Sequence, residues 1–132
     1  MKIEHIGIAV KKLSESIPLF EKLLSTPCYK TEAVESEQVN TAFFQTGDSK
    51  IELLEAYAPG SVINKFIDKK GEALHHLAFE VEDIEKEATR LKGQGFEMIG
   101  EKPKKGADNK MVWFLHPKST NGILIELVME IK

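Results

Sequence analysis

A histidine and a glutamate recur at matched positions in two similar stretches of this chain. A shift of 71 residues aligns IEHIGIAVKKL with LHHLAFEVEDI and places His5 over His76. A shift of 74 residues aligns IELLE with IELVME and places Glu52 over Glu126. Two imidazoles and two carboxylates form a suitable ligand set for one divalent metal ion. The repeat therefore predicts a duplicated module in which each half supplies one His and one Glu to a shared metal site.

The alternation of apolar and polar residues predicts which way the carboxylates point. In GILIELVME, Ile125 and Leu127 are expected to pack on one face of a strand, which leaves Glu126 on the other face. The same alternation in KIELLEA separates Glu52 from its apolar neighbours. A carboxylate buried among apolar side chains is costly unless it is paired, and a bound cation removes that penalty. The pattern therefore favours a metal ligand over a solvated glutamate at both positions.

The expected chemistry follows from this ligand set. Two nitrogens and two oxygens leave coordination positions open for water or substrate, and cobalt, nickel, manganese and zinc all accept such ligands. An open position suits Lewis-acid catalysis, in which a carbonyl is polarised and an enolate stabilised while a carboxylate removes the α proton. The two remaining histidines are assigned other roles. His75 alternates to the face opposite His76 and is interpreted as structural, whereas His116 precedes Pro117 and is interpreted as a loop residue or substrate contact.

The same periodicities predict an α+β fold. Two βαβββ modules in tandem are expected to form a curved, mostly antiparallel eight-stranded sheet around a metal cleft. We expect one domain over 1–132, with module one at 1–56, a connector containing a short helix at 57–73, and module two at 74–132.

Individual elements follow from apolar spacing and from turn residues. Ser14 or Ser16 is expected to cap the first helix, and Asp83 the second. The expected helices lie at 14–24 and 84–94, and the expected strands at 3–10, 29–34, 39–46, 50–56, 74–81, 96–100, 111–116 and 122–130.

Composition narrows the classes of function. The chain has 132 residues, 42% hydrophobic and 30% charged, which is typical of one soluble globular unit. A net charge of −3 with mixed signs gives no electrostatic case for nucleic acid. No apolar run approaches the roughly 20 residues of a membrane span. The strand pattern that begins near residue 3 leaves no room for a signal peptide, and the single Cys28 fits a reducing environment, so a cytoplasmic location is expected.

With these residues in view, the chain resembles the vicinal oxygen chelate superfamily, which includes glyoxalase I, extradiol dioxygenases and bleomycin-resistance proteins. Within that superfamily it is similar to the methylmalonyl-CoA epimerase family. The resemblance is carried by the strings HIGIAV, KIELLE, LHHLAFEVEDI and FLHPKSTNGILIEL, which are spread over nearly the whole chain. The doubled histidine and the HPKS turn resemble the epimerases more than glyoxalase I.

The resemblance implies a metal-dependent isomerase that inverts the α carbon of methylmalonyl-CoA through an enolate stabilised by the metal. By position, His5, Glu52, His76 and Glu126 would be the ligands of one divalent ion. Glu126 and Glu52 would also be the catalytic carboxylates. The resemblance further implies a homodimer.

A coenzyme A thioester also needs contacts to its phosphates. Lysines gather in the 101–119 loops, where Lys105 and Lys118, together with His116, are the expected substrate-binding residues. The expected partner is a small-molecule thioester, with no nucleic acid and no membrane.

The group that acts on the opposite face of the substrate is left open. Some relatives supply it as a Glu in the second strand, but the matching position here is Thr41, and no carboxylate occurs within 39–46. Glu52, a water, or no group at all are the alternatives.

Two other functions fit the same residues. A lactoylglutathione lyase (glyoxalase I) would isomerise a hemithioacetal with the same four ligands. A non-catalytic small-molecule-binding protein would sequester its ligand without chemistry. An iron dioxygenase is disfavoured, because it usually uses two histidines and one carboxylate.

Overall fold

The computed structural model describes all residues from 1 to 132, and the chain divides into two compact units. The first unit comprises His5–His75, and the second comprises Met1–Glu4 together with His76–Lys132. The chain passes from one unit to the other inside strand β1 (Lys2–Ala9), between Glu4 and His5, and again inside strand β5 (Ala73–Glu80), between His75 and His76.

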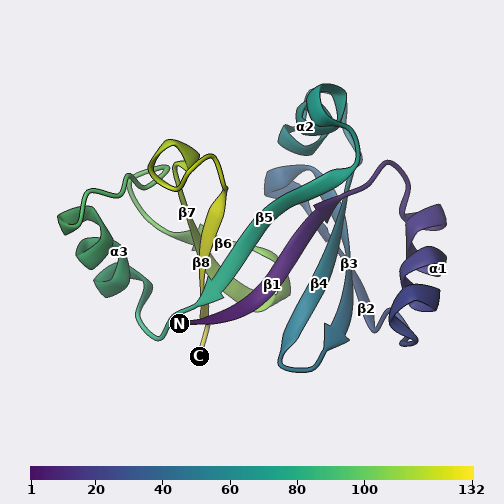
Figure 1. The fold of residues 1–132 in the computed structure, drawn as a ribbon, viewed down its shortest axis with the longest axis horizontal. Helices are drawn as coiled ribbons and strands as arrows, with labels where there is room; N and C mark the ends of the chain where they lie inside the picture. Colours follow the sequence, from purple (N-terminus) through teal and green to yellow (C-terminus); the bar gives the residue numbers. More distant parts are fainter. The chain divides into compact units, whose positions relative to one another are not determined.

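The first unit follows the predicted strand–helix–strand–strand–strand order and adds a helix (Figure 1). Strand β1 pairs in parallel with β4, which pairs antiparallel with β3, and β3 pairs antiparallel with β2. Besides β1, its elements are α1 (Leu13–Leu24), β2 (Lys30–Val34), β3 (Val39–Thr46), β4 (Ser49–Ala56) and α2 (Val62–Lys70).

The second unit repeats this wiring. Strand β5 pairs in parallel with β8, which pairs antiparallel with β7, and β7 pairs antiparallel with β6. Besides β5, its elements are α3 (Ile84–Gly93), β6 (Lys104–Lys105), β7 (Lys110–Leu115) and β8 (Ile125–Glu130). The strands form one eight-stranded mixed sheet in the order β2-β3-β4-β1-β5-β8-β7-β6. The α+β class and the two βαβββ modules are thus confirmed.

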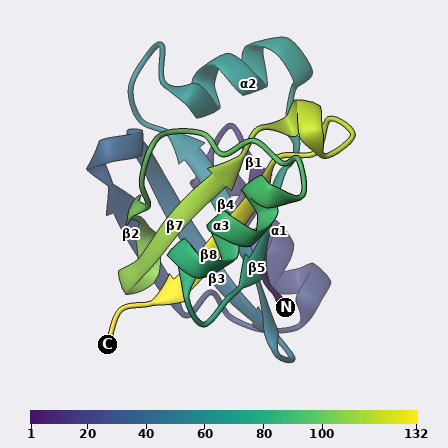
Figure 2. The ribbon, with the colours of Figure 1, turned by 90° about the vertical axis from the view of Figure 1, so that its left-hand side faces the viewer.

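Each module covers one face of its strands with a helix, as the alternation predicts. In the first unit α1 packs on a cluster that includes Phe44 and Leu53, and in the second unit α3 packs on Trp113 and Leu127 (Figure 2). Helix α2 lies on the other face of the first unit, where Ile63 contacts a cluster that contains Leu54. Helix α2 therefore covers one end of the face of β4 that carries Glu52 and Leu54, while α1 packs on the opposite face.

Truncation of a core residue tests this packing. Leu127 is 1% exposed and lies under α3, so Leu127→Ala is expected to lower the free energy of unfolding by about 2–5 kcal/mol through lost burial and a residual cavity. Urea denaturation followed by circular dichroism measures this. Ile123 is 52% exposed and serves as the control, because Ile123→Ala is expected to change the stability by no more than about 0.5 kcal/mol. Equal effects of both substitutions would contradict the assigned core.

The strand predicted at 96–100 is wrong in extent. Only a single bridge between Met98 and Leu115 forms there, flanked by the Ile99 N–H to Phe114 carbonyl bond at 2.8 Å. Gly95 and Gly100 both have positive φ, at 96° and 84°, so the backbone turns at each end before a ladder can extend. The edge strand of this module is instead the two-residue β6.

The predicted serine caps of the first helix are also wrong. Lys12 is the N-cap of α1 and makes no side-chain cap bond, and the helix contains Pro18 in its interior. The Glu55 carboxylate, from β4, accepts the Leu13 N–H at 2.9 Å. A residue distant in sequence therefore satisfies a donor that a local serine was expected to satisfy. Asp83 does cap α3, accepting the Lys86 N–H at 3.0 Å.

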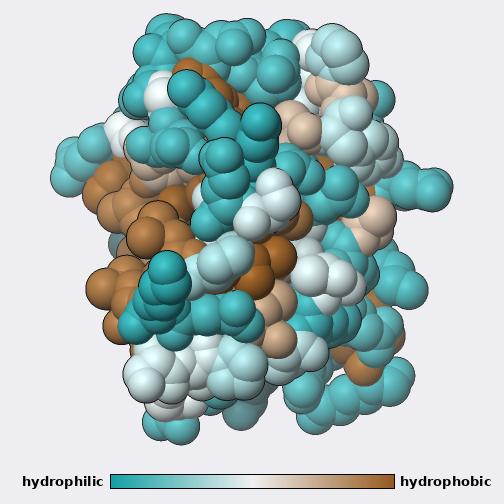
Figure 3. Space-filling model, turned by 90° about the vertical axis from the view of Figure 1, so that its right-hand side faces the viewer, coloured by the Kyte–Doolittle hydropathy of each residue, from teal (hydrophilic) through white to brown (hydrophobic).

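Helix α1 is apolar beyond the side that packs on the strands. Leu19 and Leu23, one turn apart, are 60% and 70% exposed, and Figure 3 shows apolar atoms gathered on this side of the molecule. Of the three α-helices, none has both the length and the apolar content needed to cross a membrane.

Candidate metal centre

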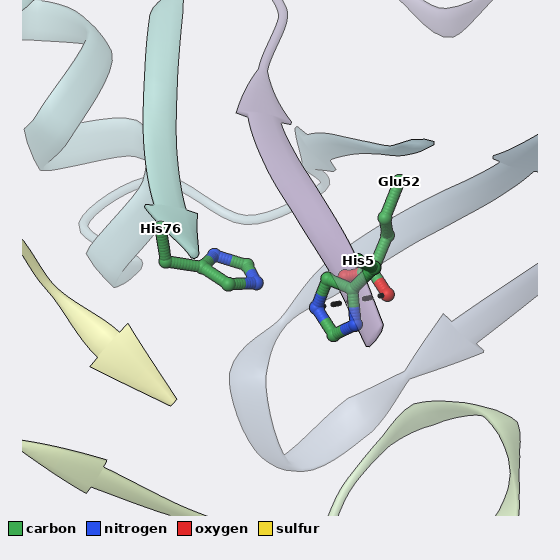
Figure 4. Close-up of side chains that lie close together, drawn as sticks. All are labelled: His5, Glu52 and His76. Carbon is green, nitrogen blue, oxygen red and sulfur yellow. Dashed lines mark ion pairs between the residues drawn. The ribbon is translucent and has the colours of Figure 1, made fainter. Parts of the chain in front are cut away.

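In the first unit, β1 and β4 bring a histidine and a glutamate together. The parallel register places Gly7 beside Glu52, and His5 lies two residues before Gly7 on the same face. His5 Nε2 lies 3.8 Å from Glu52 Oε2, and each residue is 6% exposed. Figure 4 shows the imidazole and the carboxylate turned toward each other. The alternation predicted for both strands is confirmed here.

The second unit builds the same pair from β5 and β8. The register places Ala78 beside Glu126, which is the position that Gly7 holds beside Glu52 in the first unit. His76 Nε2 lies 3.2 Å from Glu126 Oε1, and the two residues are 7% and 6% exposed. The His76 ring also contacts Phe114 edge-on, with ring centroids 5.9 Å apart. Duplication of the module has therefore duplicated a buried His–Glu pair.

Three of the four predicted ligands form one group. The ligand atoms of His5, Glu52 and His76 lie within 4.8 Å of one another, and all three residues are buried (Figure 4). Imidazole nitrogens and carboxylate oxygens suit divalent transition metals. A cation also offsets the cost of removing the Glu52 carboxylate from water. Without a cation, His5 offsets that cost only when its imidazole is protonated. The residues present therefore fit a divalent ion.

The other two histidines, His75 and His116, are not part of this ligand group. His75 contacts Phe66 of α2 edge-on, with ring centroids 4.9 Å apart, which agrees with a structural role. His116 Nδ1 accepts the Lys118 N–H at 3.1 Å and so caps the short 3-10 helix Pro117–Ser119. This contact gives His116 a structural reason to be present, in addition to any role at a substrate.

The predicted substrate lysines lie in the second unit. Lys105 is exposed in β6, and Lys118 Nζ makes a surface ion pair with Glu97 Oε1 at 3.1 Å. Exposed pairs of this kind contribute about 0–1 kcal/mol, so Lys118 can exchange this partner for a phosphate at little cost. Contact of Lys105, His116 and Lys118 with a substrate stays a prediction.

A second carboxylate on the Glu52 face of the first unit was missed by the sequence reasoning. The register pairs Phe43 with both Lys30 and Glu52, and in the adjacent row it pairs Thr41 with Glu32. Lys30 Nζ lies 3.3 Å from Glu32 Oε1 and 5.6 Å from the centroid of the Phe43 ring. The available signal was the period of two in KTEAV, which places both charged residues on one face of β2.

Comparison with known proteins defines the class. A family model described as the Glyoxalase/Bleomycin resistance protein/Dioxygenase superfamily matches residues 4–114. The chain is 36% identical over 128 residues to the ethylmalonyl-CoA/methylmalonyl-CoA epimerase of Cereibacter sphaeroides, which covers 96% of each chain. It belongs to this superfamily, as its resemblance to the vicinal oxygen chelate proteins predicted.

Solved structures extend the likeness to the epimerase members. Methylmalonyl-CoA epimerase from Mycobacterium tuberculosis matches with a TM-score of 0.94 and 31% identity, over 98% of this chain and 88% of that one. A variant of the Streptomyces coelicolor methylmalonyl-CoA epimerase in complex with 2-nitronate-propionyl-CoA matches with a TM-score of 0.92 and 30% identity, over 100% and 99% of the two chains. Methylmalonyl-CoA epimerases are thus enzymes that this chain resembles in both sequence and structure.

Proposed function

We propose that this chain is a metal-dependent methylmalonyl-CoA epimerase, which inverts the α carbon of the thioester through an enolate. The observation that carries the proposal is the buried group of His5, Glu52 and His76, whose ligand atoms lie within 4.8 Å of one another. The names of the relatives support the choice of substrate. The complex of one relative with a propionyl-CoA analogue supports a thioester ligand.

His5, Glu52, His76 and Glu126 would hold one divalent ion, of which cobalt, nickel, manganese and zinc suit these donors. When bound, the ion supplies positive charge that favours negative charge on the thioester carbonyl oxygen. The duplication supports the fourth ligand, because Glu126 stands beside Ala78 as Glu52 stands beside Gly7.

Glu126 is the proposed base. The α carbon of methylmalonyl-CoA lies between a thioester carbonyl and a carboxylate, so its proton is acidic enough for a positioned side chain to remove. The Glu126 carboxylate accepts this proton, the C–H electron pair moves toward the carbonyl oxygen, and an enolate results. Return of a proton to the opposite face of the carbon gives the other epimer. Because Glu126 is 6% exposed, the carboxylate acts where bulk water has little access.

Proton exchange in deuterated water tests the function. The purified protein, loaded with Co²⁺, is incubated with one epimer of methylmalonyl-CoA and separately with the hemithioacetal of methylglyoxal and glutathione. We expect deuterium at the α carbon of methylmalonyl-CoA and interconversion of its epimers, measured by NMR and mass spectrometry. Formation of lactoylglutathione without α exchange would replace the proposal with a lyase. Binding of the thioester without any exchange would replace it with a non-catalytic binding protein.

The proposal also includes the organisation expected from the sequence. It takes the chain as one functional domain, active as a homodimer in the cytoplasm, with His116, Lys105 and Lys118 contacting the coenzyme A part of the substrate. Sedimentation of the purified protein tests the dimer.

Replacement of Lys105 and Lys118 by Met is expected to raise KM about 10-fold or more while kcat changes little, because the contacts lie away from the reacting carbon.

A further inference from the structure

Inversion at carbon removes a proton from one face of the substrate and returns one to the opposite face, and the proposed base Glu126 accounts for one face. We infer that Glu32, on β2, is the second proton-transfer group; this inference rests on the proposed function. The sequence alone allows Glu52, a water or no group in this role. The register of the first unit points to a different carboxylate.

Glu32 shares a face of the sheet with Glu52. Directly opposite residues of antiparallel strands point to the same side, so the pairing of Glu32 with Thr41 puts both side chains on the face that carries Phe43 and Glu52. On that face of β1 to β4, Glu32 and Glu52 are the two carboxylates. The side chains that share this face include His5, Lys30, Thr41 and Phe43.

The spacing of the two carboxylates leaves room for a substrate. Glu32 lies on β2, two strands away from β4, and the register places it level with Leu54, two residues beyond Glu52. At the usual strand and residue spacings, the Cα atoms of Glu32 and Glu52 are therefore about 12 Å apart. Each glutamate side chain shortens the gap between the two carboxylates. An acyl group bound between Glu32 and Glu52 therefore lies within reach of both carboxylates.

The surroundings of Glu32 suit a group that must exchange its proton in every turnover. Its side chain is 31% exposed on the edge strand of the sheet, so solvent can reprotonate it. Lys30 Nζ lies 3.3 Å from the carboxylate. Thr41 Oγ1 donates to the Glu32 backbone carbonyl at 2.8 Å and so holds this residue in place. Glu32 is thus anchored through its main chain while its carboxyl group stays accessible.

The proton transfers balance in both directions. Protonated Glu32 donates its proton to the enolate carbon, the electron pair returns from the oxygen to form the new C–H bond, and Glu32 becomes a carboxylate. In the reverse direction the Glu32 carboxylate removes the α proton of the other epimer, and protonated Glu126 delivers a proton on its own face. No oxidant or further reactant is needed.

A single-sided exchange experiment tests the role. In Glu32→Gln we expect epimerisation to fall about 10²–10⁴-fold, the usual loss on removal of one general acid–base group. The epimer whose α proton faces Glu126 is expected to keep exchanging that proton for deuterium without inversion, whereas the wild type exchanges both epimers and inverts them. Glu35→Gln, an exposed glutamate just after β2, is the matched control and should behave as wild type.

Each result decides the question. Epimerisation by Glu32→Gln within about threefold of wild type overturns the inference and leaves the proposed function intact. Loss of inversion and of all exchange in a variant that melts at the wild-type temperature also overturns it, because Glu32 would then be needed for binding. If Glu32→Gln does not fold, Glu32→Asp serves, with reduced inversion and retained one-sided exchange expected. An absence of exchange in the wild type withdraws both the function and this role.

Discussion

Replacement of Glu126 by Gln is expected to lower kcat for methylmalonyl-CoA epimerisation by about 10²–10⁴-fold, since an amide cannot accept the α proton. Glu126 is buried on β8 and lies 3.2 Å from His76, so the amide also replaces a metal ligand by a weaker one. Saturating Co²⁺ in the assay compensates for weaker metal binding, so the loss of kcat that remains reports the missing base. The rate is measured in a coupled assay, with a second enzyme that consumes only the epimer that is formed.

Glu130 supplies the control for this substitution. It lies on the same strand, is exposed, and pairs with Lys110 at 3.5 Å. We expect Glu130→Gln to retain wild-type kcat, because its side chain is 64% exposed and Glu130 is not one of the four proposed ligands. Near-wild-type turnover by Glu126→Gln at saturating metal would rule out Glu126 as the base.

His76→Ala has the second large expected effect. Loss of this imidazole removes one member of the ligand group and leaves the buried Glu126 without its His76 contact. We expect affinity for Co²⁺ to fall by at least about 100-fold, more than the loss seen when an outer-shell partner of a ligand is removed, and activity to fall with it. Calorimetric titration measures the affinity, and a chelator-treated wild type gives the metal-free reference.

The neighbouring histidine provides a control for this change. His75 is one residue away, faces the opposite side of β5 and contacts Phe66 instead of the ligand group. His75→Gln is expected to bind Co²⁺ with wild-type affinity while melting at a lower temperature. Equal losses of metal affinity in the two variants would mean that His76 acts through the stability of the strand and not as a ligand.

The parts of the site that follow from local periodicity were predictable from the sequence. A period of two in GILIELVME separates Glu126 from Leu127, and the structure places Leu127 under α3 while Glu126 meets His76 on the other face. The internal repeat added the pairing, because two modules with the same wiring bring equivalent residues together. Duplication thus supplied information that one strand alone does not contain.

Features that depend on partners far along the chain were not predictable in this way. Glu32 gains its position only through the β2–β3 register, and a sequence pattern does not show which residues lie opposite each other across strands. Local rules favour a serine cap at the N-terminus of α1, whereas Glu55 on a distant strand accepts the helix N–H. The 96–100 segment has a strand-like composition, but two glycines with positive φ end the pairing after one bridge.

The stoichiometry of Co²⁺ binding tests the shared site most directly. Calorimetric titration of the chelator-treated wild type is expected to give one ion per chain. His5→Ala and His76→Ala, one from each half of the repeat, are each expected to weaken that single binding event by at least about 100-fold. Two ions per chain, with each substitution removing only one of them, would show that the His–Glu pairs are separate sites. No binding by the wild type would show that the pairs are not a metal centre.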